Sequence, residues 1–97
     1  MIGAWFLTSH GLTVTHRNVN VDRGEVDLVA WDGDQRVVTE VRSVSFSVDP
    51  IDAIHAAKRR RVAGLAARIG VTRVDYLGVG FTDAYIDFHW VPGSSST

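Results

Sequence analysis

The sequence contains no cysteine, which excludes disulfide bonds and thiolate metal sites and is compatible with the cytoplasm. No apolar run approaches the roughly 20 residues that a membrane-spanning helix needs, so we expect no membrane partner. The apolar start, residues 1–7, is short and has no basic flank, and we do not expect a signal peptide there. Neither sign of charge dominates, since 10 Lys and Arg oppose 11 Asp and Glu. The overall charge therefore gives no indication of nucleic-acid binding.

A chain of 97 residues predicts one domain with a single modest core. We expect this domain to cover residues 1–92. Residues 93–97 are Gly, Ser and Thr only, a composition typical of a disordered tail.

The spacing of apolar and turn residues predicts two helices and five strands. One helix, over residues 3–10, ends at Gly11. A second is capped by Asp49 with Pro50 at its first position, and it ends at Gly70. Strands are expected over residues 12–16, 25–31, 35–43, 73–81 and 84–91, with a polar turn region at 18–24. The predicted order, α-β-β-β-α-β-β, indicates an α/β domain in which helices flank a central mixed sheet.

Two of the predicted strands carry carboxylates within otherwise apolar runs. If residues 33–34 form the loop between them, Asp27 lies directly opposite Glu40, and Glu25 lies opposite Arg42. Opposed residues have Cβ atoms about 4.5–5.5 Å apart. Two carboxylates that close repel each other unless a proton or a cation intervenes. A hard divalent cation such as Mg²⁺ suits this geometry.

Two interpretations of this hairpin stay open from spacing alone. One is an ion site, and the other is a surface network in which Glu25 pairs with Arg42, an arrangement that contributes little to stability. The alternation also predicts which apolar residues lie on each face. Leu28, Ala30 and Val41 face away from the acids toward a helix, whereas Val29, Trp31 and Val38 share the acidic face.

The hairpin and its surroundings resemble the YraN family. That family is assigned to the PD-(D/E)xK, or restriction-endonuclease-like, superfamily and is close to archaeal Holliday junction resolvases. The resemblance covers nearly the whole chain. The matching segments are Arg17-Asn18, residues 24–30 (GEVDLVA), Asp32-Gly33, residues 38–43 (VTEVRS), residues 58–62 (KRRRV) and residues 73–76 (RVDY).

The resemblance implies a restriction-endonuclease-like core and a catalytic site. Asp27 and Glu40, with the backbone carbonyl of Val41, would hold Mg²⁺ or Mn²⁺. Glu25 would join them as a ligand or a neighbour. Arg42 would stabilise the charge that develops on the phosphate.

The basic run at residues 58–61 is either a solvated helix face or a surface that contacts the substrate. Lys58, Arg59 and Arg60 are expected to stay exposed and to bind phosphates, together with Arg17, while Arg61 turns inward. Contacts of this kind position a DNA backbone without reading its sequence. The implied partner is DNA, branched or single-stranded, and a homodimer is a further expectation.

The sequence departs from the family pattern at two places. Arg42 stands where the family has Lys, and Arg cannot readily move a proton. The carboxylate of the family's first helix falls at or before Met1. Three functions therefore stay open: a metal-dependent DNA endonuclease, a nuclease-fold DNA-binding module with impaired catalysis, and a protein-interaction module.

Overall fold

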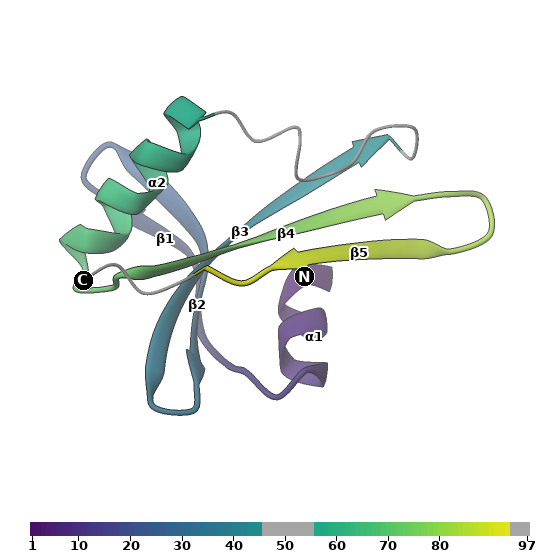
Figure 1. Ribbon diagram of the computed structural model, residues 1–97, viewed down its shortest axis with the longest axis horizontal. Coiled ribbons are helices and arrows are strands. Elements are labelled where there is room, and N and C mark those ends of the chain that lie inside the picture. Colours follow the sequence, from purple (N-terminus) through teal and green to yellow (C-terminus); the bar gives the residue numbers. More distant parts are fainter. Residues whose placement is uncertain (46–55, 94–97) are drawn as a thin grey trace.

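The computed structural model describes residues 1–45 and 56–93, which form two helices and five strands in the predicted order (Figure 1). The five strands form one sheet of order β1-β2-β3-β4-β5. The elements are α1 (Ile2–Ser9), β1 (Thr13–Val21), β2 (Gly24–Asp32), β3 (Gln35–Ser45), α2 (Ala56–Arg68), β4 (Arg73–Phe81) and β5 (Ile86–Val91).

The sheet is mixed, as predicted. Neighbouring strands are antiparallel except for β3 and β4, which pair in parallel. A parallel pair needs a long crossover connection, and α2 lies within it. In the part of the chain that the structure describes, no helix is long and apolar enough to cross a membrane.

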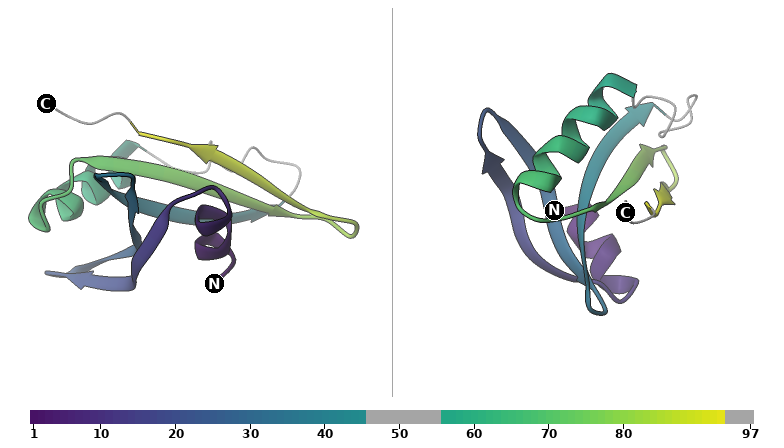
Figure 2. Two further views of the ribbon diagram at one scale, coloured as in Figure 1. Left: turned by 90° about the horizontal axis from the view of Figure 1, so that it is seen from below. Right: turned by 60° about the vertical axis from the view of Figure 1, so that its left-hand side comes forward.

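The two helices cover opposite faces of the sheet (Figure 2). Leu28 and Ala30 pack with α1, and Val41 borders that cluster. Val29 and Val38 pack with α2 on the other face. This confirms the predicted facing of these residues. Because both faces of β2 and β3 are covered, residues 37–40 are all buried.

The first strand is longer than predicted. Residues 18–21, expected to belong to a turn, continue β1 and pair with β2 up to Val21 opposite Gly24. The register shifts between Val14 and His16, and Asn18 has a positive φ of 53°. These irregularities break the alternation of apolar and polar residues. An edge strand also tolerates polar side chains on both faces, which is why the sequence resembled a turn there.

The predicted helix ends are confirmed, since Gly11 and Gly70 follow α1 and α2 with φ values of 88° and 77°. The predicted start of the second helix at Asp49 and Pro50 lies outside the described residues. So do residues 94–97 of the predicted tail, whereas the backbone N–H of Gly93 donates a hydrogen bond of 2.7 Å to Asp75.

A buried ionic network ties three parts of the fold together around Asp75, whose side chain is fully buried. Arg73 Nε and Nη2 donate to its two oxygens at 2.9 and 3.0 Å, and Trp90 Nε1 donates at 3.1 Å. Arg73 Nη1 also donates to Asp32 and Gln35, at the end of the β2–β3 hairpin. The hydrogen bonds to Asp75 are the main reason that the pKa of Arg73 is raised. The sequence offered no role for Arg73 and Asp75 beyond the family resemblance.

Candidate functional site

The β2–β3 hairpin has the predicted register. Asp32 pairs with Gln35 across the loop of residues 33–34, and the ladder continues to Leu28 opposite Thr39. Asp27 and Glu40 come next on the two strands, where the ladder ends. The predicted pairing of Glu25 with Arg42 lies beyond it and does not form, while on the other edge of β2 Glu25 pairs with Asn20 of β1.

Side chains replace the backbone ladder at this point. The backbone N–H of Val41 donates to Asp27 Oδ2 at 2.8 Å, and the backbone N–H of Asp27 donates to Glu40 Oε1 at 3.2 Å. Each carboxylate therefore accepts a hydrogen bond from the strand that carries the other. This reciprocal arrangement fixes both acids where the strands separate.

Glu40 is the buried member of the pair, with 4% of its surface exposed. Burial, and secondly the charge of Asp27, raise the pKa of Glu40 from 4.5 to about 7. The opposing effects of the backbone N–H of Asp27, Lys58 and Arg42 are smaller. The protein therefore holds a carboxylate whose negative charge is under-compensated at neutral pH.

Helix α2 places a cation beside this acid. Lys58 Nζ lies 3.9 Å from Glu40 Oε2, and the lysine side chain is 23% exposed. The helix can approach β2 closely because Gly24 has no side chain. A Cβ at this position would lie only 2.6 Å from Leu65 Cδ1. Sequence analysis expected Lys58 to stay exposed and Arg61 to turn inward. Lys58 is instead half-buried beside the acid, whereas Arg61 is exposed, although it lines the cavity beside Glu40.

The acids and this lysine line one cavity of about 290 Å³. Its walls come from the start of β2, from β3 and from α2. The lining residues are Arg23, Gly24, Glu25, Asp27, Glu40, Lys58, Arg61, Val62 and Leu65. The structure thus brings together Glu25, Asp27, Glu40 and Lys58 of the predicted site.

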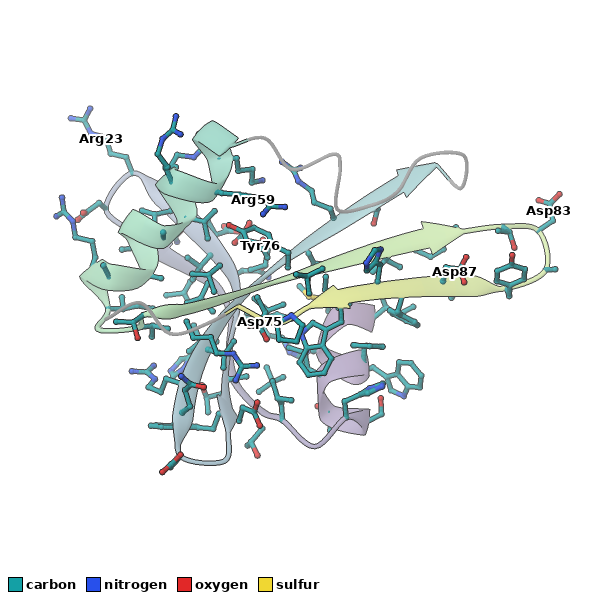
Figure 3. The ribbon with its side chains drawn as sticks, viewed as in Figure 1. Arg23, Arg59, Asp75, Tyr76, Asp83 and Asp87 are labelled. Carbon is teal, nitrogen blue, oxygen red and sulfur yellow. The ribbon has the colours of Figure 1, made fainter. Side chains whose placement is uncertain are left out.

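Other predicted residues lie elsewhere. The guanidinium of Arg59 lies over the ring of Tyr76, 4.9 Å from its centroid (Figure 3). Tyr76 is opposite Glu40 in the parallel β3–β4 ladder, and burial raises its pKa. Among the lining residues that the structure describes, neither Arg42 nor Arg17 appears. Arg42 Nε is buried and has no hydrogen-bond partner within the described part of the chain.

The donor set suits a hard cation with few protein ligands. Within residues 1–45 and 56–93, no three His, Cys, Asp or Glu side chains gather as a closed metal cluster. Mg²⁺ is commonly held by one or two carboxylates while it keeps several waters. Asp27 and Glu40 offer two carboxylates, and the raised pKa of Glu40 indicates charge that a cation would compensate. The residues present therefore fit Mg²⁺ or Mn²⁺.

Fold and site together define a small α/β protein with an acidic cavity beneath a basic helix. The chain belongs to the uncharacterised protein family UPF0102, also called YraN, whose model matches residues 1–79. This confirms the family resemblance that the sequence motifs indicated.

Relatives in distant bacteria share most of the chain. A UPF0102 protein of Chromohalobacter salexigens is 37% identical over 95 residues, which cover 89% of this chain and 77% of the relative. One from Thermotoga maritima is 36% identical over 81 residues, which cover 76% of this chain and 75% of the relative. One from Symbiobacterium thermophilum is 43% identical over 74 residues, which cover 69% of this chain and 62% of the relative.

DNA binding and a homodimer stay predictions.

Sequence reasoning gave no role to two residues around the cavity. Arg23 lines it, and Tyr76 lies beside Glu40 on the neighbouring strand. The signal for Tyr76 was weak, because strand register across a parallel pair cannot be derived without the crossover. Arg23 was assigned to a polar turn, although a cation immediately before the acidic strand could have been noted.

Proposed function

We propose that this protein is a metal-dependent DNA endonuclease, built on a restriction-endonuclease-like core and similar in activity to Holliday junction resolvases. The observation that carries the proposal is the cavity in which Asp27 and Glu40 face each other with Lys58 beside them. Paired carboxylates with an adjacent cation are suited to hydrolysis of phosphodiester bonds. Branched and single-stranded DNA are the first substrates to test.

Asp27 and Glu40, with the Val41 carbonyl, would hold Mg²⁺ or Mn²⁺. When bound, such an ion polarises a phosphate and lowers the pKa of an attacking water. The protein's own contribution is preorganisation, because hydrogen bonds from the opposite strand hold each carboxylate before substrate arrives. Glu25 lies exposed on the cavity wall, where it can accept hydrogen bonds from water that enters with the substrate.

The family pattern has a lysine where this chain has Arg42. Lys58 supplies the ammonium group in its place. Its Nζ is 3.9 Å from Glu40 and lines the same cavity, whereas Arg42 does not line it. A compact ammonium can donate hydrogen bonds to the phosphate oxygens as negative charge develops on them. Arg42 stays close enough to Glu40 to lower its pKa, and this identifies it as an electrostatic support.

The proposal is tested by incubating labelled four-way junction, flap, single-stranded and duplex DNA with the protein and Mg²⁺, Mn²⁺ or EDTA. We expect metal-dependent cleavage, reduced about 10³-fold in Asp27→Asn because several kcal/mol of charge stabilisation is lost. Asp83→Asn, an exposed acid on the far hairpin in Figure 3, is the control and should cut at the parent rate. Full activity in Asp27→Asn would overturn the mechanism.

Lys58→Met keeps the length of the side chain and removes its charge. We expect cleavage to fall about 10²-fold, the usual effect of losing one donor to a developing anion. The pKa of Glu40 should rise further, because Lys58 lowers it in the parent. Arg36→Met, which removes a cation beside the loop of the β2–β3 hairpin and outside the cavity lining, is the control. Equal rates for Lys58→Met and the parent would remove Lys58 from the mechanism.

A second candidate is the DNA-binding module with impaired catalysis. The specific observation in its favour is that Arg42 replaces the family lysine and lies outside the lining of the acidic cavity. This candidate predicts DNA binding that weakens with salt and no cleavage with either metal. Cleavage by Arg42→Lys, when the parent does not cut, would support it directly.

A further inference from the structure

A second hollow continues from the acidic cavity along α2. It has a volume of about 640 Å³ and is lined by Asp22, Arg23, Gly24, Arg61, Leu65 and Arg68. Four of these residues, Arg23, Gly24, Arg61 and Leu65, also line the acidic cavity. The two hollows are therefore adjacent, and together they make up the groove between the β1–β2 turn and α2.

The charges along this groove change sign. Its inner end is lined by Asp27 and Glu40, and its outer end is lined by an exposed ion pair between Arg68 and Asp22 at 2.8 Å. Arg23 and Arg61 lie between these ends and line both hollows. Among the described residues, neither has an acidic partner within ion-pair distance. Figure 3 shows Arg23 at the β1–β2 turn, beside α2.

We propose that Arg23 and Arg61 form a phosphate subsite, which holds the backbone phosphate next to the one placed at the carboxylates. This proposal rests on the proposed function for its substrate class, a DNA strand. Two guanidinium groups facing one groove suit a phosphodiester, because each presents a planar fork of donors to phosphate oxygens. The strand then follows the groove along α2 from the acids toward Arg68.

The subsite differs from the basic surface that the sequence indicated. Arg59 stacks over Tyr76, and Arg60 is absent from the described lining of both hollows. The run of four cations at residues 58–61 is thus divided among different tasks. Lys58 faces Glu40, Arg59 covers Tyr76, and Arg61 joins Arg23 across the groove.

The test is equilibrium binding of short labelled single-stranded and duplex DNA in EDTA, followed by fluorescence anisotropy over a range of salt concentrations. We expect Arg23→Gln and Arg61→Gln each to weaken binding about 5- to 10-fold, an energy within the range of a single hydrogen bond at an exposed site. Each should reduce the salt slope by about 0.7–0.9, the value for one lost phosphate contact. Arg36→Gln, which removes a cation beside the loop of the β2–β3 hairpin and outside the lining of both hollows, is the control and should bind within about twofold of the parent. Thermal melting should confirm that each of the three variants is folded.

The subsite is overturned if Arg36→Gln weakens binding as much as the other two variants, or if the parent does not bind DNA. Binding in EDTA does not depend on cleavage, so the two proposals fail separately. A parent that never cuts, but whose binding needs Arg23 and Arg61, supports the subsite while ending the nuclease proposal. A parent that cuts, with binding unchanged in Arg23→Gln and Arg61→Gln, ends the subsite alone.

Discussion

Asp75→Ala should lower the free energy of unfolding by about 3 kcal/mol, the low end of the cost of removing one partner from a buried ion pair, because Asp32 still faces Arg73. Arg73 would keep its charge with only 8% of its surface exposed, and it would lose two of its four hydrogen bonds. The donors of Trp90 and Gly93 would lose their acceptor as well. Domains of this size are stable by about 5–15 kcal/mol, so the change removes a large share of the total.

Urea unfolding followed by circular dichroism measures this effect. Asp75→Asn keeps the shape of the side chain and one acceptor oxygen, and we expect it to cost about 2 kcal/mol, which keeps the test informative if the alanine variant does not fold. Asp83→Ala removes an exposed acid from the β4–β5 hairpin and should change stability by less than about 0.5 kcal/mol. An Asp75→Ala protein as stable as Asp83→Ala would contradict the structural role of the network.

Glu40→Gln should have opposite effects on stability and activity. In the parent, the pKa of Glu40 is 4.5 unfolded and about 7 folded, chiefly because of burial. Between these values the folded state binds a proton that the unfolded state has released. The contribution of Glu40 to the stability of the folded state is therefore fully present below about pH 4.5. It is lost as pH rises through 7, and the free energy of unfolding falls by about 3 kcal/mol at most.

Glutamine keeps an oxygen that can accept from the N–H of Asp27, and it cannot ionise. In EDTA, we expect Glu40→Gln to be more stable than the parent at pH 8 and nearly equal to it at pH 5. Cleavage should be lost, because one of the two carboxylates proposed to hold the cation is gone. Glu25→Gln, an exposed acid of the same cavity, should show no such gain.

Urea unfolding at pH 5 and pH 8, with and without Mg²⁺, separates these effects. Mg²⁺ should stabilise the parent at pH 8, since a ligand of the folded state raises stability, and should do little for Glu40→Gln. If the free energy of unfolding of the parent does not change between pH 5 and 8, the pKa of Glu40 is not raised in the folded state. A parent indifferent to Mg²⁺ and Mn²⁺ would argue against the cation site.

The facing of Asp27 and Glu40 could be predicted because a two-residue loop leaves only one register for a hairpin. Strand alternation then assigned Leu28 and Val29 to opposite faces, and the structure confirms it. The extent of the ladder could not be predicted. Its end after Leu28 and Thr39 depends on side chains that take over the backbone hydrogen bonds. For the same reason the expected pairing of Glu25 with Arg42 did not form.

By itself, the sequence determined what is local in the chain. Element types follow from side-chain periodicity, helix ends from Gly11 and Gly70, and the facing acids from a short loop. Only the tertiary structure decided which cation meets which acid. The rotation of α2 about its axis is set by packing of Val62 and Ala66 on the sheet, and that rotation directs Lys58 rather than Arg61 to Glu40. Packing of this kind brings together residues that are distant in sequence, and it cannot be predicted from the local pattern of side chains.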